Sequence, residues 1–265
     1  MQHIFNLNHR KERNNVEIKA VKLYENGFMT GLFATGGGCD TSTPDDGVRY
    51  PSSLQNFLID TGKEVILVDT GVPKETKNAE PNEKTRIYMG TRIKDYVSAL
   101  EAMGYSTEQV TRILVTHKHP DHSGELRSFP NAKIYIAPED AEALKLSGDN
   151  VVLLKYADGP YHNFGSSEKI ADGIYMLPAK GHTKGNSIVV AESDGLFYLM
   201  QGDVTYTDAA LKGNKLSVIF EDLQAARETL EKVRTFVKEN PTVYLSTHTP
   251  EACASLENKT VMKLD

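Results

Sequence analysis

The segment VTHKHPDHSGE, residues 115–125, places three histidines and one aspartate within six consecutive positions. The whole chain of 265 residues contains only 8 histidines. Imidazole and carboxylate groups are costly to bury unless hydrogen bonds, opposite charges or a metal satisfy them. The segment is therefore either a solvated loop or a place where polar side chains converge on a cation, and the rest of the sequence has to decide between the two.

The spacing inside this segment suits two neighbouring metal positions. In an extended chain, residues i and i+2 point the same way, so His117 and His119 can bind one ion together. Asp121 and His122 begin the turn into a helix that we expect around residues 123–129, and the turn displaces their side chains to a second position.

Further functional groups, ligands among them, come at the ends of predicted strands elsewhere in the chain. They are Asp69, His182, Asp203 and His248. Functional groups gather at the carboxyl ends of strands in α/β folds. A structural zinc site normally closes with four ligands, often cysteines, but here no cysteine lies in the motif and the donors outnumber the needs of one ion. Two ions about 3.5–4 Å apart that share a bridging carboxylate fit better, and iron and manganese use such ligands as well as zinc.

The hydrophobic pattern predicts an α/β chain in which strands alternate with helices. The predicted strands are 57–60, 64–71, 112–117, 133–137, 173–179, 186–192, 195–203 and 242–248, and the predicted helices are 91–104, 139–146 and 223–240. Thr91 is the expected N-cap and Gly104 the C′ residue of the first helix. The polar stretches 36–53 and 72–90 are predicted to be long loops. Helices that cover sheets give a layered α/β domain.

Composition and charge argue against several classes of partner. A net charge of −6 and a pI of about 5.8 disfavour nucleic acid or an anionic membrane as the main partner. No apolar run approaches the roughly 18 residues that a membrane span needs. Cys39 and Cys253 are too few for a disulfide framework and are expected to be reduced. Together with the absence of an apolar leader in the first residues, these features predict a cytoplasmic location.

The order of the candidate ligands resembles the metallo-beta-lactamase superfamily. The HxHxDH motif at 117–122, the later His182, Asp203 and His248, and the sequence ILVDTG at 66–71 carry the resemblance. It implies one domain over residues 1–265 with an αβ/βα four-layer sandwich. By position, it implies that His117, His119 and His182 hold one metal, that Asp121, His122 and His248 hold a second, and that Asp203 bridges them. Asp69 would support a ligand without binding a metal.

Within that superfamily the chain is similar to the N-acyl homoserine lactonases. ILVDTGVP is followed by a long insert, and GDVTYTD places Tyr206 where those enzymes carry a catalytic tyrosine. The resemblance implies a hydrolase, monomeric or homodimeric, that acts on a small acyl substrate. A hydroxide held between two divalent ions, with zinc expected and iron or manganese as alternatives, would attack the carbonyl. Tyr206 would donate a hydrogen bond and Asp121 would shuttle the proton. Pro120, Asn186 and Thr249 depart from the pattern and leave the substrate in doubt.

Other functions of the same scaffold remain open. A glyoxalase II-like thioesterase would use the same seven ligands and would need basic residues to hold a glutathione-like acid. A persulfide dioxygenase would use one iron and perform redox chemistry. A non-catalytic metal-binding or sensor protein would bind metal without catalysing a reaction. A true β-lactamase lacks the bridging aspartate, and a tRNA-processing nuclease needs a basic face. Loops 36–53, 72–90 and 147–168 are expected to determine which substrate binds.

Overall fold

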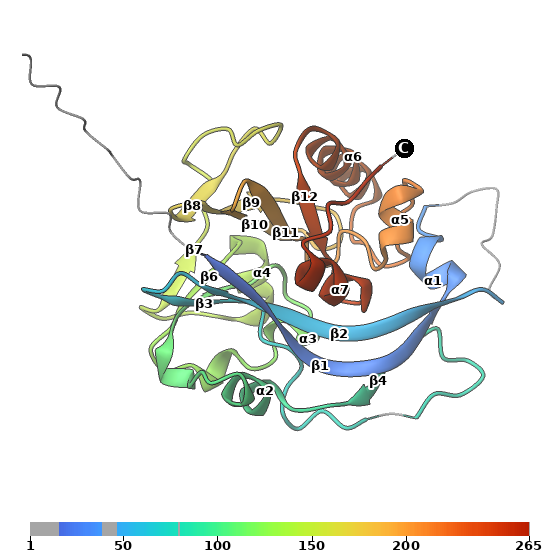
Figure 1. Cartoon of the computed structure of the whole chain (residues 1–265), viewed down its shortest axis with the longest axis horizontal. Coiled ribbons are helices and arrows are strands. Elements are labelled where there is room, and N and C mark those ends of the chain that lie inside the picture. The colour runs from blue at the N-terminus through green and yellow to red at the C-terminus, as the bar shows by residue number, and fades with distance from the viewer. Residues whose placement is uncertain (1–15, 39–46, 79, 265) are drawn as a thin grey trace, which may run out of the picture.

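Two mixed β-sheets pack face to face in the computed structural model, which describes residues 16–38, 47–78 and 80–264 (Figure 1). The seven-stranded sheet has the order β4-β1-β2-β3-β5-β6-β7. Its strands are β1 (Glu17–Thr30), β2 (Arg49–Asp60), β3 (Val65–Val68), β4 (Ile87–Arg92), β5 (Val110–Leu114), β6 (Lys133–Ile136) and β7 (Val151–Leu153). The five-stranded sheet has the order β12-β11-β10-β9-β8. Its strands are β8 (Glu168–Ala171), β9 (Ile174–Pro178), β10 (Ser187–Ser193), β11 (Leu196–Met200) and β12 (Thr242–Leu245).

Helices cover the outer faces of both sheets and line one edge of the sandwich. They are α1 (Gly31–Thr35), α2 (Tyr96–Ala102), α3 (Pro120–Ser123), α4 (Pro138–Leu144), α5 (Asp208–Lys212), α6 (Leu223–Glu239) and α7 (Glu251–Asn258). In Figure 1, α6 lies above the five-stranded sheet and α2 below the seven-stranded sheet. Helices outside and two sheets inside give the four layers that the sequence predicts, so the predicted fold class is confirmed.

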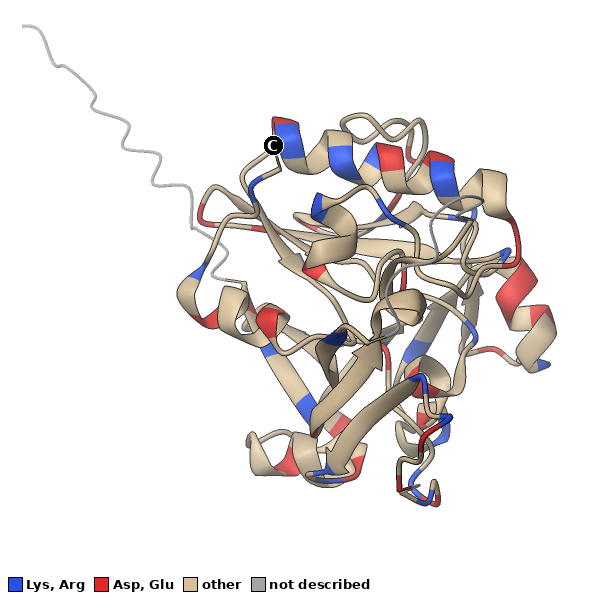
Figure 2. Cartoon of the chain, turned by 90° about the vertical axis from the view of Figure 1, so that its right-hand side faces the viewer, with Lys and Arg blue, Asp and Glu red and all other residues tan. Residues whose placement is uncertain are grey.

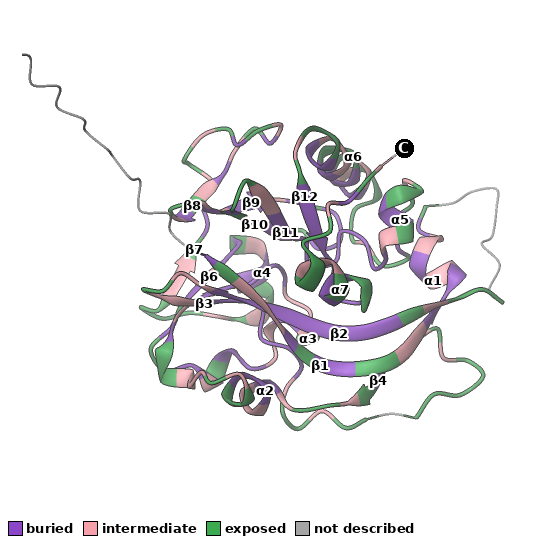
Figure 3. Cartoon of the chain, in the orientation of Figure 1, coloured by how far each residue is buried: buried purple, intermediate pink, exposed green. Residues whose placement is uncertain are grey.

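The side chains of each central strand alternate between two apolar cores. On β3, Ile66 and Val68 point into the core between the sheets, whereas Leu67 packs in the core that α2 covers. On β10, Val189 faces the core between the sheets and Val190 packs in the core that α6 covers. Burial on both faces explains why these strands are almost continuously apolar in sequence. Figure 3 shows the contrast between the buried strands and the exposed outer faces of the helices.

The N-terminal half contains strands that the sequence did not predict. β1 pairs with both β2 and β4, and β2 begins at Arg49, inside the stretch expected to be a loop over 36–53. β4 occupies the end of the other expected loop, 72–90. The helix predicted over 91–104 is therefore shorter, and α2 begins at Tyr96 with Asp95 as its N-cap. The predicted Thr91 cap is wrong because Thr91 pairs with Glu25 in the sheet.

Charged side chains of both signs are interspersed on the surface. Figure 2 shows Lys and Arg next to Asp and Glu along the long helix α6 at the top of the view. Among the described residues, none of the helices combines the length and apolar character that crossing a bilayer requires. Cys253 is buried with a free thiol, and Cys39 lies outside the described residues.

Candidate metal centre

The strands that precede the candidate ligands end at the same edge of the sandwich. β3 and β5 are parallel neighbours, and Asp69 and His117 follow them. In the other sheet, β9 and β11 are each antiparallel to β10, and β12 is parallel to β11, so these three strands run in one direction. The loops after them carry His182, Asp203 and His248. All seven residues that the sequence predicts as metal ligands are brought together here.

The first group consists of His117, His119, His182 and Asp203, and their ligand atoms lie within 4.8 Å of one another. Nδ1 of His119 is 3.1 Å from Nε2 of His117 and 3.0 Å from Nε2 of His182. A tetrahedral zinc ion with bonds of about 2.0–2.1 Å sets its ligand atoms roughly 3.3–3.4 Å apart. The spacing of this group is therefore suited to a single ion.

The second group consists of Asp121, His122, Asp203 and His248. Nε2 of His248 lies 3.2 Å from Oδ2 of Asp121, and Nε2 of His122 lies 3.8 Å from that same oxygen. Asp121 reaches this position because α3 begins at Pro120, immediately after the extended His119. The turn separates the two groups as the HxHxDH spacing predicts.

Asp203 belongs to both groups and turns one oxygen towards each. Its Oδ2 lies 3.4 Å from Nε2 of His182 and 3.7 Å from Nε2 of His117. Its Oδ1 lies 3.2 Å from Nε2 of His122. Nε2 of His248 is almost equidistant from the two oxygens, at 3.2 Å from Oδ1 and 3.3 Å from Oδ2. A carboxylate with this arrangement can bridge two ions.

Three polar atoms of the second group are buried without a hydrogen-bond partner in the structure. One is Nδ1 of His248; the other two, Nε2 of His122 and Oδ1 of Asp203, lie 3.2 Å apart. Buried nitrogen and oxygen atoms are normally hydrogen-bonded, and a metal ion between the latter two would satisfy both. Imidazoles and carboxylates without a thiolate suit zinc, iron or manganese. The residues present therefore fit divalent metals.

Burial and neighbouring charges separate the pKa values of the histidines. Burial lowers the pKa of His182 to about 4 and holds that of His117 well below its usual range. Burial also disfavours the charged form of His248, but the carboxylates of Asp203 and Asp121 outweigh it and raise the pKa of His248 to about 10. His117 and His182 thus offer neutral imidazoles directly, whereas His248 has to release a proton before it can bind a metal.

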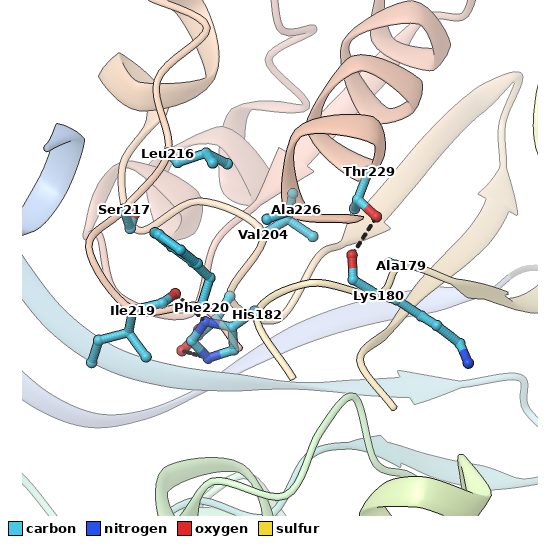
Figure 4. Close-up of a pocket in the computed structure, with 11 residues that line it drawn as sticks. Ala179, Lys180, His182, Val204, Leu216, Ser217, Ile219, Phe220, Ala226 and Thr229 are labelled. Carbon is cyan, nitrogen blue, oxygen red and sulfur yellow. Dashed lines mark hydrogen bonds and ion pairs between the residues drawn. The ribbon is translucent and has the colours of Figure 1, made fainter. Parts of the chain in front are cut away.

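Hydrogen bonds from outside the two groups orient the imidazole rings. Oδ2 of Asp69 lies 2.7 Å from Nδ1 of His122, and the carboxylate also accepts hydrogen bonds of 2.7 Å from the backbone N–H and the hydroxyl of Thr116. Nδ1 of His182 lies 3.0 Å from the carbonyl oxygen of Ile219. Figure 4 shows the His182 ring beside Ile219 and Phe220, in the loop before α6. Such contacts fix which ring nitrogen faces the metal position.

A cavity of about 480 Å³ opens beside the two groups. The ligands His119, Asp121, Asp203 and His248 form part of its wall, and Tyr206 also faces it. The other lining residues are Tyr24, Phe33, Val72, Thr76, Lys77, Asn78, Ile87, Tyr88, Met89, Gly90, Pro120 and Ile219. Apart from the ligands, Lys77 is the one charged side chain among these lining residues. The cavity therefore suits a largely apolar molecule with a polar end near the ligands.

Tyr206 lies between the cavity and the ligands. Its ring stacks on Phe33 with centroids 5.3 Å apart and lies edge-on to His248 at 5.1 Å. Burial, reinforced by the negative charges of Asp203 and Asp121, raises the pKa of Tyr206 well above its usual value. The hydroxyl therefore stays protonated and acts as a hydrogen-bond donor.

The sequence did not predict the residues that form the cavity wall opposite the ligands. Phe33 comes from the short helix α1, and Ile87, Tyr88 and Met89 come from β4. The position of the β4 residues depends on the pairing of β4 with β1. Ile87, Tyr88 and Met89 are three consecutive apolar residues followed by Gly90, so the local sequence shows no alternation that would predict this strand.

Several known proteins are similar to this chain in sequence. A family model described as the metallo-beta-lactamase superfamily matches residues 53–248. An N-acyl homoserine lactonase of a Bacillus species is 25% identical over 217 residues, which cover 77% of this chain and 84% of the lactonase. A probable metallo-hydrolase of Mycobacterium tuberculosis is 26% identical over 133 residues, 43% of each chain.

Two solved structures share the fold at low identity. One is an N-acyl homoserine lactone hydrolase with N-hexanoyl-L-homoserine bound at its catalytic metal centre. It has a TM-score of 0.68 and 18% identity, with 92% of this chain and 96% of the other covered. The second, AidC, is a dizinc quorum-quenching lactonase, with a TM-score of 0.60 and 16% identity, and 89% and 92% covered.

Proposed function

The chain belongs to the metallo-beta-lactamase superfamily, and on this basis we propose that this metal-dependent hydrolase holds two metal ions and opens the ring of an N-acyl homoserine lactone. The observation that carries the dinuclear part is the position of Asp203, whose Oδ2 faces His182 and His117 whereas its Oδ1 faces His122. The relatives named as lactonases, at 25% identity, support the choice of substrate class.

We assign the ligands by group. His117, His119 and His182 would hold one ion, Asp121, His122 and His248 the other, and Asp203 would bridge them. Divalent ions at these positions would activate a water molecule and stabilise negative charge on a carbonyl oxygen. We take zinc as the expected metal because imidazole and carboxylate oxygens are among its usual ligands, with iron or manganese as alternatives.

The other residues would act on the substrate and on protons. Tyr206, a permanent donor at the cavity wall, would hydrogen-bond to the carbonyl or to the leaving oxygen of the substrate. Burial alone would raise the pKa of Asp121, but His122 and His248 lower it to about 2, so its carboxylate is ionised and suited to bind a metal. Its proposed role as proton shuttle rests on its place at the cavity wall, next to the substrate position, and not on its pKa. The apolar wall that includes Phe33 and Met89 would hold the acyl chain and exclude water.

The cavity lining favours this substrate over the thioester of a glutathione-like acid. Glutathione carries two carboxylates, which need basic partners, and Lys77 is the one basic side chain among the lining residues. A persulfide dioxygenase with a single iron would leave the second group without a role. Metal analysis together with oxygen consumption distinguishes that alternative.

A hydrolysis panel on metal-quantified protein tests the proposal. N-hexanoyl homoserine lactone, an S-acyl glutathione and bis(p-nitrophenyl) phosphate would be compared by kcat/KM at equal metal content. We expect the lactone to be turned over with the highest kcat/KM and about two ions per chain. A higher kcat/KM for the thioester would replace the substrate assignment, and one ion per chain at full activity would refute the dinuclear site.

A further inference from the structure

A fully buried carboxylate lies behind the first ligand group and has no part in the assignments above. Asp140, in the first turn of α4, is 0% exposed. Within the described residues, no lysine, arginine or histidine forms an ion pair with it. Buried charges in proteins are normally paired or bind metals. Hydrogen bonds therefore have to offset the free-energy cost of burying the Asp140 carboxylate.

Three donors surround the Asp140 carboxylate, and all three come from loops that carry ligands. Oδ2 accepts from the backbone N–H of Lys118 at 3.0 Å and from the hydroxyl of Thr183 at 2.7 Å. Oδ1 accepts from the backbone N–H of Gly185 at 3.2 Å. Lys118 stands between His117 and His119, whereas Thr183 directly follows His182. One carboxylate thus joins the two loops that supply every imidazole of the first group.

The sequence of the second loop permits this close approach. A Cβ atom added to Gly185 would lie 2.8 Å from Cγ and 2.9 Å from Oδ1 of Asp140. Both distances are shorter than real Cβ contacts, so a side chain at this position would push the carboxylate away from its donors. Glycine at 185 and aspartate at 140 form a matched pair.

A second acidic residue spans the same loops from the surface. Glu221 accepts from Nζ of Lys118 at 2.5 Å and from the backbone N–H of Lys184 at 2.8 Å. Its side chain is 32% exposed, so water and salt weaken these bonds. The buried bonds of Asp140 have no such competition, and Asp140 is the stronger of the two links.

We propose that Asp140 is a positioning residue that sets the spacing of His117, His119 and His182 for their metal ion. The inference rests on the proposed function insofar as these three residues are assigned as ligands. The second group receives its imidazoles from His122 and His248, neither of which hydrogen-bonds to the Asp140 carboxylate among the described residues. His122 lies in α3, four residues beyond Lys118, and its ring is held by Asp69 instead. Loss of the Asp140 carboxylate should therefore weaken one ion and spare the other.

Competitive zinc titration of metal-free full-length protein against a chromophoric chelator tests this. Asp140→Asn keeps the shape of the side chain but removes one acceptor, and we expect one of the two ions to bind about 10–100-fold more weakly. Thr183→Val removes one donor and should give a smaller loss. Asp60→Asn is the matched control, because Asp60 also accepts two hydrogen bonds of 2.8 Å, from Gly62 and Tyr105, on a strand outside the site. It should leave both affinities unchanged.

A double variant identifies the ion that is weakened. His119→Ala should lose the ion of the first group, and adding Asp140→Asn to it should cause no further loss, because both changes act on the same site. Circular dichroism of the metal-free proteins checks that each variant folds, and Thr183→Val carries the test if Asp140→Asn does not. Unchanged affinities in the folded variant, or an equal loss at both sites, would overturn the inference.

The outcome can be separated from that of the proposed function. A wild-type protein that binds two ions but leaves lactones intact would refute the substrate and leave the role of Asp140 standing. A wild-type protein that binds one ion would refute the dinuclear site. In that case the single ion has to bind more weakly in Asp140→Asn, and an unchanged affinity would refute the positioning role as well.

Discussion

Oδ2 of Asp69 lies 2.7 Å from Nδ1 of His122, and both side chains are almost completely buried. A carboxylate in this position accepts a hydrogen bond from the Nδ1–H of the ring and leaves the lone pair of Nε2 free to face a metal. Asp69 adopts a φ of 65°, a left-handed conformation that few residues other than glycine and aspartate or asparagine accept. The turn after β3 thus places the carboxylate behind the ring.

Asp69→Asn should weaken the ion of the second group. The amide retains only one acceptor oxygen for the ring of His122 and the two donors of Thr116. We expect a loss of about 10–100-fold in zinc affinity at one site, with the first group unaffected. Competitive chelator titration measures this, with Asp60→Asn as the control. Equal affinities for both ions in Asp69→Asn and wild type would show that Asp69 has no such role.

Tyr206→Phe should separate catalysis from metal binding. The variant keeps the ring that stacks on Phe33 and removes only the hydroxyl. Loss of a donor to developing negative charge typically costs about 10²–10³ in kcat. Steady-state kinetics on protein with measured metal content should show that decrease at an unchanged metal-to-protein ratio. Full activity in the variant would remove Tyr206 from the mechanism.

Ile219→Ala should weaken the binding of lactones with long acyl chains selectively. The Ile219 side chain is 44% exposed and lines the mouth of the cavity, so its truncation leaves the folded core intact. We expect about 1–2 kcal/mol less binding free energy, or roughly a 5–30-fold higher KM, for an N-decanoyl lactone. The KM of an N-butanoyl lactone should stay the same.

Leu223→Ala is the control for that prediction, because Leu223 is similarly exposed at 42% and does not line the cavity. An identical change in KM for the short and the long lactone would mean that the acyl chain does not pass Ile219.

Asp208→Asn should stabilise the fold at neutral pH. Burial, together with the charge of Glu251, raises the pKa of Asp208 to about 6, against about 3.9 in an unfolded chain. Between these values the folded state binds more protons, so stability falls as the pH rises from about 4 to 6. Above that range the ionised carboxylate lowers the free energy of unfolding by at most about 3 kcal/mol.

Thermal melts of metal-free Asp208→Asn and wild type between pH 5 and 8 test this. The variant should melt a few degrees higher at pH 7.5, and the difference should shrink towards pH 5. Asp149→Asn, at an exposed position, should show no such trend. A difference that is independent of pH would contradict the assigned pKa.

The ligands were predictable from sequence because each is tied to local chemistry. His117 and His119 are placed by an extended segment, Asp121 and His122 by a helix that starts at proline, and the remaining ligands by strand ends. Such features depend on residues a few positions away. Strands with continuous apolar runs and helices with one apolar face predicted a layered α/β domain. The four-layer sandwich itself was implied by the resemblance to the metallo-beta-lactamase superfamily.

The cavity wall and Asp140 were not predictable because they depend on distant pairings. β1 contains the polar run Glu25-Asn26-Gly27 and two register shifts, so its alternation is broken where it meets β4. An aspartate in the first turn of a helix is common, because its negative charge interacts favourably with the helix dipole. Asp140 differs from such residues only through donors that lie 22 to 45 positions away.

The site draws its ligands from both sheets, and its last ligand, His248, follows β12 close to the end of the described chain. If the site holds two ions as proposed, the ribosome would have to release this segment before the second ion could bind. A truncated product that ends earlier than residue 248 would lack that ligand, so loading with both ions would report that synthesis has passed this residue. Pulse-labelled chains of increasing length, assayed for bound zinc, would reveal a step at this point.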